Sequence, residues 1–146
     1  MVELEVLNLF HAEILAVIHR QCFEKSWSKD FFKNLLTGPT NCPVFGWVVL
    51  QNQTPAGFIL ARHLISETEI LTFCILPNYR NKGLGQSLVK QLIQNCQKPI
   101  FLEVAIYNQS ALNLYQRAGF VITGKRKNYY NDKQGQLEDA YVMEYK

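Results

Sequence analysis

The residues of this sequence best suited to chemistry form a short turn of glycines and basic side chains, Arg80-Asn81-Lys82-Gly83-Leu84-Gly85. A helix that begins at such a turn presents unpaired backbone N–H groups at the positive end of its dipole, and these groups attract anions. Gly83 and Gly85 would let the backbone come close to a phosphate. Arg80 and Lys82 would add positive charge. The turn therefore predicts a site for a phosphorylated ligand.

Two well-known phosphate-binding turns do not match this segment. A Walker loop needs Gly-Lys-Ser/Thr, which does not follow here, and the dinucleotide fingerprint needs a third glycine where Gly85 is followed by Gln86-Ser87-Leu88. Taken alone, the turn could also be a loop that does no more than start a helix. The segments that follow it are needed to decide.

Two further candidate groups lie downstream. Glu103 stands within the apolar run Ile100–Ala105, where a carboxylate is more often functional than a solvated surface group. Asn108 then opens a polar helix entry, and Tyr115 follows on the inner side of the same helix. Tyr115 could act on a ligand, or it could be a core aromatic residue with a satisfied hydroxyl group.

The turn and the segment from Asn108 to Phe120 together resemble the GNAT superfamily of acetyl-coenzyme A-dependent N-acetyltransferases. Both motifs of that superfamily, Q/R-x-x-G-x-G/A and N-x-x-A-x-x-x-Y-x-x-x-G-F, are complete here. The resemblance implies acetyl-coenzyme A as the acetyl donor and cosubstrate. It implies that the coenzyme is held by the end of a strand, by the turn and by the second motif, through Phe73, Cys74, Ile75, Arg80, Asn81, Lys82, Gly83, Leu84, Gly85, Gln86 and Asn108.

The resemblance also implies the catalytic roles. Glu103 would remove a proton from the acceptor amine, either as an unusually basic carboxylate or through a water molecule. A backbone N–H near Ile75 would stabilise the tetrahedral oxyanion, and Tyr115 would face the coenzyme sulfur and assist its departure. Because the superfamily uses direct transfer, we do not expect an acetylated Cys74, although this residue lies beside the expected coenzyme path.

Within the superfamily, the sequence is most similar to the bacterial ribosomal-protein-alanine N-acetyltransferase (RimI) family. The similarity implies transfer of the acetyl group to the N-terminal alanine amine of a ribosomal protein. It rests on short segments spread along the chain: Trp27-Ser28, Leu102-Glu103-Val104, Asn108 with Tyr115, Arg126-Lys127-Asn128-Tyr129-Tyr130, and Glu138-Asp139-Ala140. The residues expected to contact the acceptor peptide are Glu69, Tyr129, Tyr130, Glu138 and Asp139.

Three positions depart from that family: Ser26 stands where Pro is usual, Ala105 where Arg is usual, and Tyr107 where a small polar residue is usual. Ala105 and Tyr107 lie near the expected acceptor side, so they bear on the substrate and not on the class of activity. The reference pKa of a protein α-amine is about 2.5 units below that of lysine, which favours an N-terminal acceptor. A lysine acceptor, a small-molecule amine and a non-catalytic coenzyme-binding module are the alternatives.

The elements that must position these residues follow from apolar periodicity and turn signals. We expect an α/β domain with the GNAT fold, a mixed sheet of six to seven strands flanked by about four helices, and the resemblance implies that the fourth and fifth strands splay apart. The expected strands are Val2–Val6, Val44–Leu50, Ala56–Ile65, Glu69–Leu76, Ile100–Ala105, one from Phe120 onward, and Glu138–Tyr145. The first should be half-buried, because apolar and acidic residues alternate along it. The expected helices cover Ile14–Cys22, Ser28–Leu36, Leu84–Ile93 and Ala111–Ala118. Ser28 should cap the second helix, and Gly119 should end the fourth in the left-handed conformation.

The composition fits a single domain spanning residues 1–146, since 48% of the residues are hydrophobic. A net charge of +3 is too mild to indicate nucleic acid as a partner. No apolar run suits a membrane span or an export signal, so we expect a cytoplasmic protein, monomeric or weakly dimeric, whose partner is a ribosomal protein N-terminus. The four cysteines, Cys22, Cys42, Cys74 and Cys96, are expected to be free thiols, and no metal site is expected.

Overall fold

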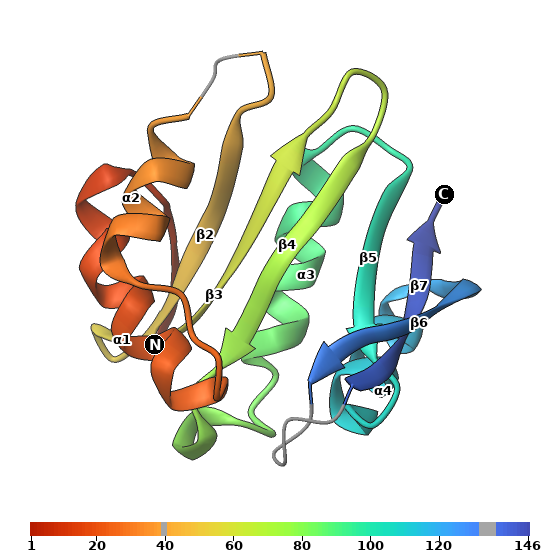
Figure 1. Cartoon of the computed structure of the whole chain (residues 1–146). Coiled ribbons are helices and arrows are strands. Elements are labelled where there is room, and N and C mark those ends of the chain that lie inside the picture. Colours follow the sequence, from red (N-terminus) through yellow and green to blue (C-terminus); the bar gives the residue numbers. More distant parts are fainter. Residues whose placement is uncertain (39–40, 132–136) are drawn as a thin grey trace.

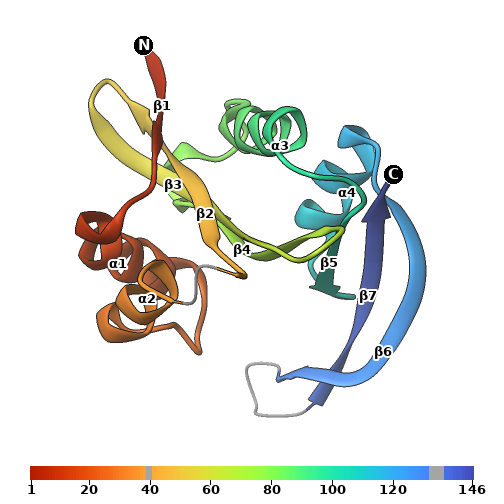
Figure 2. The ribbon, with the colours of Figure 1, turned by 90° about the horizontal axis from the view of Figure 1, so that it is seen from above.

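Seven strands form one mixed sheet with helices on both of its faces (Figures 1 and 2). The computed structural model describes residues 1–38, 41–131 and 137–146, and the side chains of 128–131 and 137 lie outside the described part. The strands are β1 (Val2–Val6), β2 (Val44–Gln51), β3 (Thr54–His63), β4 (Thr68–Ile75), β5 (Ile100–Ala105), β6 (Val121–Asn131) and β7 (Leu137–Tyr145). The helices are α1 (Ala12–Cys22), α2 (Lys29–Leu36), α3 (Leu84–Asn95) and α4 (Gln109–Ala118), with short 3-10 turns η1 (Leu9–His11) and η2 (Pro77–Tyr79). The predicted fold is thus confirmed.

The strand order is β1-β2-β3-β4-β5-β7-β6, in which β4 and β5 are the parallel pair. These two strands pair only at their beginnings, where Thr68 lies opposite Ile100 and Glu69 opposite Phe101. On its other side β4 stays paired with β3 as far as Ile75. The sheet is therefore split between its fourth and fifth strands, as expected, and one edge of β4 has no β5 partner beyond Glu69.

Helices α1 and α2 cover one face of the sheet, and α3 and α4 cover the other (Figure 2). Strand β3 lies between the two layers and alternates between them: Phe58 and Leu60 pack with α1 and α2, whereas Ile59 packs with α3. All three side chains are fully buried. Successive side chains of a strand point to opposite faces, so a strand covered on both sides reads as a continuous apolar run.

Local capping explains where the elements begin and end. The Ser28 side chain accepts a hydrogen bond from Phe31 N at 3.1 Å and starts α2, and Asn108 Oδ1 accepts one from Ala111 N at 3.3 Å and starts α4. Gly119 ends α4 in the left-handed conformation with φ 109°, as predicted. These caps are encoded within a few residues, which is why the sequence located them.

Two sequence-based expectations need correction. Strand β1 was expected to be half-buried, but Val2 and Val6 are 47% and 65% exposed, because β1 is an edge strand that pairs with β2 alone. The hairpin between β2 and β3 is also tighter than expected. Asn52 and Gln53 both have positive φ, 49° and 69°, which closes the turn in two residues and lets β3 begin at Thr54 instead of Ala56.

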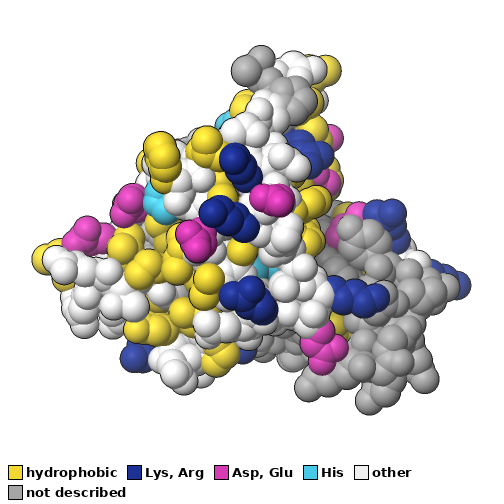
Figure 3. All heavy atoms as spheres, turned by 60° about the vertical axis from the view of Figure 1, so that its left-hand side comes forward, with side chains coloured by type: hydrophobic (Ala, Val, Ile, Leu, Met, Phe, Trp, Pro, Cys, Tyr) yellow, Lys and Arg dark blue, Asp and Glu magenta, His cyan; other side chains and the backbone are white. Residues whose placement is uncertain are grey.

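The described surface carries charges of both signs. Figure 3 shows the face where α1 and α2 come forward, with Lys and Arg side chains lying among Asp and Glu side chains. None of the helices in the described ranges is long and apolar enough to cross a membrane. Within the same ranges, no group of three or more His, Cys, Asp and Glu residues could hold a metal ion.

A buried histidine fixes the loop between α1 and α2. His19 is 3% exposed, and its Nδ1 accepts a hydrogen bond from Trp27 N at 3.0 Å. Since Nδ1 is an acceptor, Nε2 carries the hydrogen and donates to Thr72 Oγ1 at 3.2 Å. The imidazole also stacks on the Trp27 ring at 5.0 Å. Burial lowers the pKa of His19 to about 4, so the neutral ring links α1, the loop and β4.

This histidine should make stability depend on pH. Between about pH 6.5 and about pH 4 the unfolded chain binds a proton at His19 that the folded chain does not, so the free energy of unfolding falls as the pH falls through this range. In His19→Gln the amide oxygen can still accept from Trp27 N, but nothing titrates. Urea denaturation at about pH 7 and about pH 4.5 should show a smaller difference in the variant, by roughly 2 kcal/mol. Equal differences in the two proteins would contradict the assignment.

Candidate functional site

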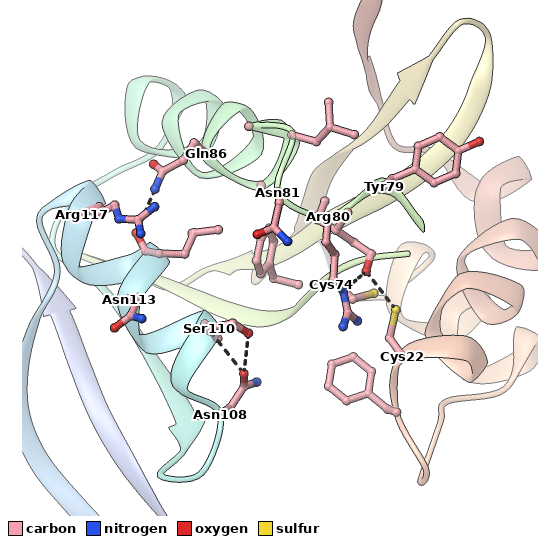
Figure 4. A pocket seen from close by; sticks show the side chains of 18 residues that line it. Cys22, Cys74, Tyr79, Arg80, Asn81, Gln86, Asn108, Ser110, Asn113 and Arg117 are labelled. Carbon is pink, nitrogen blue, oxygen red and sulfur yellow. Dashed lines mark hydrogen bonds between the residues drawn. The ribbon is translucent and has the colours of Figure 1, made fainter. Parts of the chain in front are cut away.

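A cavity of about 750 Å³ opens where β4 ends, α3 begins and α4 passes close by (Figure 4). Its wall brings together nearly all the residues expected to hold a coenzyme: Phe73, Cys74, Ile75, Arg80, Asn81, Gly83, Leu84, Gly85, Gln86 and Asn108. Lys82 is the exception. Its ammonium group lies over the Tyr79 ring, 5.8 Å from the ring centroid, and Lys82 does not line the cavity.

Gly85 sets how closely the elements around the cavity, α3, α4 and β4, approach one another. A Cβ atom at Gly85 would lie 2.7 Å from Leu114 Cδ1 and 3.0 Å from Phe73 Cζ. Both distances are shorter than ordinary contacts between carbon atoms. Glycine at this position therefore lets the first turn of α3 pack against both α4 and β4.

The start of α3 has the backbone geometry expected of an anion site. Gly83 is the N-cap residue with φ 81°, and Asn81 is also left-handed with φ 63°. The first N–H groups of a helix have no acceptor within the helix, and at α3 no side chain caps them. Because Gly83, Leu84 and Gly85 line the cavity, this end of the helix lies at its wall. The arrangement favours a negatively charged group there.

The charged side chains in the wall are cationic. Arg80 and Arg117 line the cavity, and no carboxylate is among its described lining residues. Arg80 Nε donates to the Ile75 carbonyl oxygen at 2.9 Å, which folds the side chain back along the end of β4. An anionic ligand would therefore meet two arginines and the dipole of α3.

The sequence alone did not indicate several lining residues. They come from the end of α1, from η2 and from one face of α4: Cys22, Phe23, Tyr79, Ser110, Ala111, Asn113, Leu114 and Arg117. The spacing of Ser110, Leu114 and Arg117 corresponds to one helical face, a signal that the sequence does contain. Cys22 and Phe23 have no such signal, because only the packing of α1 against the sheet brings them to the cavity.

Glu103 lies on β5, across the split from β4, and does not line the cavity. Its carboxylate is 23% exposed, and Arg126 Nη1 donates to both oxygens, at 2.8 and 3.1 Å. Arg126 reaches Glu103 across β7, the strand that lies between β6 and β5. Ala140 lies opposite both Arg126 and Ala105, so two buried alanines occupy the row that the arginine crosses. Arginine is the more usual residue at position 105 in the similar family, and an arginine there would compete for this space.

Tyr115 is buried, with 5% of its surface exposed. Its ring packs against Phe73, with the ring centroids 5.8 Å apart, and against Phe120 at 5.4 Å. Phe73 lines the cavity and Tyr115 does not. The tyrosine thus lies behind the cavity wall, at the side where α4 packs on the sheet.

The residues expected to contact an acceptor are distributed over two faces of the sheet. Glu69 lies at the point where β4 and β5 separate. Its Oε1 atom is 4.0 Å from Arg62 Nη1. Neighbouring residues of a strand alternate between faces, so Glu138 and Asp139 point to opposite sides. Asp139 pairs with Lys125 at 3.3 Å. The side chains of Tyr129 and Tyr130 lie outside the described part.

Known proteins resemble this chain in sequence and in structure. A model described as the acetyltransferase (GNAT) family matches residues 12–120. A Bacillus subtilis protein, provisionally named a ribosomal protein bS18-alanine N-acetyltransferase, is 30% identical over 131 residues, which cover 86% of this chain and 83% of that protein. The N-alpha-acetyltransferase 50 of Danio rerio is 27% identical over 98% of this chain and 87% of its own length. The crystal structure of the Escherichia coli ribosomal-protein-S18-alanine N-acetyltransferase superposes with a TM-score of 0.86 at 26% identity, covering 99% of this chain and 92% of that one.

A substitution at the turn tests the anion site. Gly83 has φ 81°, which β-branched residues avoid, and space for a side chain is open. Gly83→Val should therefore fold but shift the first amides of α3, and its affinity for coenzyme A should fall at least about tenfold. Gly83→Asn is the matched control, because asparagine tolerates this conformation and should lose less. Titration calorimetry measures both, with thermal unfolding as the check on folding. Undiminished binding by the valine variant would show that this turn does not hold the ligand.

Proposed function

This chain belongs to the GNAT family of acetyltransferases, and we propose that it transfers the acetyl group of acetyl-coenzyme A to the N-terminal alanine amine of a ribosomal protein. The observation that carries the donor half of this proposal is the open edge of β4 beside the uncapped start of α3. The extended pantetheine arm pairs with the β4 backbone at Phe73, Cys74 and Ile75 as an added strand. The pyrophosphate binds the amides of the turn, with Arg80 and Arg117 nearby.

The transfer is direct. The neutral acceptor amine attacks the thioester carbonyl, the tetrahedral oxyanion accepts a hydrogen bond from a backbone N–H near Ile75, and the carbon–sulfur bond then breaks. Glu103 accepts the proton of the amine through water, since it does not line the cavity. Arg126 positions the Glu103 carboxylate. The Tyr115 hydroxyl group donates a hydrogen bond to the departing sulfur, which requires it to reach into the cavity past Phe73.

The acceptor half rests on the names of the relatives and on the chemistry of amines. The Bacillus subtilis and Escherichia coli proteins are named for the alanine of ribosomal protein bS18, and the Danio rerio protein for α-amino groups. An α-amine is deprotonated more readily than a lysine amine at neutral pH, which reduces the demand on the base. Glu69 and Glu138, together with Tyr129 and Tyr130, are the residues we propose for binding the acceptor peptide in the cytoplasm.

A broader acceptor range is the second candidate. The Danio rerio relative aligns over 98% of this chain, more than the 86% of the Bacillus subtilis protein. At this level of identity, a chain that acetylates many protein N-termini would show the same similarities. The identity of the first residue accepted is therefore the property to measure.

Peptide acetylation followed by mass spectrometry tests the acceptor. The protein is incubated with acetyl-coenzyme A and one of three acceptors. The first is a peptide that begins with alanine, the second is that peptide with a blocked N-terminus and an internal lysine, and the third is a polyamine. Acetyl transfer should occur on the α-amine of the first peptide and not on the blocked one. Peptides that differ only in the first residue then distinguish an alanine-specific enzyme from a broader one. Acetylation of lysine or polyamine alone would refute the proposed acceptor.

Replacing the proposed base should separate catalysis from coenzyme binding. Glu103→Gln keeps the size of the side chain and removes its basicity, so kcat should fall by about a hundredfold or more while the Kd for coenzyme A stays within about twofold. Glu144→Gln is the matched control, because Glu144 is a carboxylate opposite Phe101 on the adjoining strand β7. Its kcat should change by less than about twofold. An unchanged kcat in Glu103→Gln over the whole pH range would refute the assignment.

A further inference from the structure

Two cysteines from distant parts of the chain meet in the wall of the cavity. Cys22 ends α1 and Cys74 lies near the end of β4, and both line the cavity (Figure 4). Their thiols lie close enough to shift each other's pKa. The Cys22 thiol also donates to the Ile75 carbonyl oxygen at 3.6 Å. In the acetyl transfer proposed above, Cys74 takes part only through its backbone and Cys22 takes no part.

A fixed positive charge stands beside this pair. Arg80 Nε donates to the Ile75 carbonyl oxygen at 2.9 Å, and this is the same oxygen that Cys22 contacts. The guanidinium group is therefore held next to the Cys22 sulfur, where its charge favours a thiolate. Neither of the other two cysteines, Cys42 and Cys96, lines the cavity in the described part of the chain.

The two thiols differ in access and in ionisation. Cys22 is half-buried, whereas Cys74 is buried with 5% exposed. The neighbouring Cys74 thiol, assisted by Arg80, lowers the pKa of Cys22 to about 7 against the opposing effect of burial. The Cys22 thiol and burial raise the pKa of Cys74. At neutral pH the accessible sulfur is thus the nucleophile, and the buried one keeps its proton.

We propose that Cys22 and Cys74 form a thiol–disulfide exchange site that reacts with low-molecular-weight disulfides entering the cavity. The Cys22 thiolate attacks one sulfur of the disulfide, forms a mixed disulfide and releases one small thiol. Cys74 then loses its proton and attacks the Cys22 sulfur, which releases the second small thiol and leaves a Cys22–Cys74 disulfide. The two protein thiols are oxidised and the small disulfide is reduced to two thiols, so the electrons balance.

The expected rate follows from the ionisation of Cys22. At pH 7 a thiol of pKa about 7 is about half thiolate, against about 3% for an ordinary cysteine, a gain of about fifteenfold. The lower basicity reduces its intrinsic nucleophilicity by about fivefold, which leaves a net advantage of about threefold. The product, a disulfide that joins Cys22 of α1 to Cys74 of β4, therefore identifies the exchange site better than the rate does.

Exchange with oxidised glutathione tests the proposal. The reduced full chain is incubated with oxidised glutathione near pH 7, quenched with acid and analysed by intact mass and non-reducing peptide mapping. The protein should lose two hydrogen atoms and give a peptide that links Cys22 to Cys74. Cys74→Ala should stop at a glutathione adduct on Cys22, and Cys22→Ser should leave Cys74 unmodified. Cys42→Ser is the matched control and should form the link at the parent rate.

Three results would overturn the proposal. The first is the absence of a Cys22–Cys74 link in the parent protein, and the second is adducts formed on Cys42 or Cys96 as fast as on Cys22. The third is an internal disulfide, through Cys42 or Cys96, that forms in Cys22→Ser or Cys74→Ala with the yield of the parent protein. If Cys74→Ala does not fold, Cys74→Ser provides the same measurement. None of these readouts requires acetyl transfer, so failure of the exchange and failure of the proposed function are distinguishable. Acetyl-coenzyme A, whose sulfur is held in a thioester and so does not exchange with disulfides, should slow formation of the adduct at Cys22 if it occupies the cavity, and that one effect rests on the proposed function.

Discussion

The early end of pairing between β4 and β5 is the constraint on which the rest of the structure depends. The two parallel strands share only the rows of Thr68 and Glu69, and the edge of β4 beyond them has no β5 partner. The chain must leave β4, form α3 and return to β5, so the start of α3 necessarily lies at the open end of the split. With a fully paired sheet, neither the cavity nor the exposed edge of β4 would exist.

Charge is divided between the two sides of this split. The described cavity wall holds Arg80 and Arg117, whereas carboxylates lie along the neighbouring strands at Glu69, Glu103 and Glu138. A polyanionic coenzyme and a cationic peptide terminus could thus approach from different sides without competing for the same groups. The Glu103–Arg126 pair crosses β7, where the buried Ala140 lies opposite Arg126.

Features encoded within a few residues were predictable, and features that depend on packing were less so. The caps at Ser28, Asn108 and Gly119 were found from sequence because their hydrogen bonds or backbone angles are local. The predicted half-burial of β1 was wrong, because alternation indicates a strand but does not indicate whether another element covers that strand. Tyr115 shows the same limit: its inward position was predictable, but its place behind Phe73 was not.

By itself, the sequence determined the order of strands and helices, the anion-binding turn at Arg80 to Gly85, and membership of the GNAT family through two contiguous motifs. Only the tertiary structure decided that Cys22 meets Cys74, that Arg126 reaches Glu103, and that Arg80 folds back onto the Ile75 carbonyl. The physical reason is separation along the chain. Turns and caps depend on near neighbours, whereas contacts between residues far apart in sequence depend on how the sheet splits and how the helices pack on it.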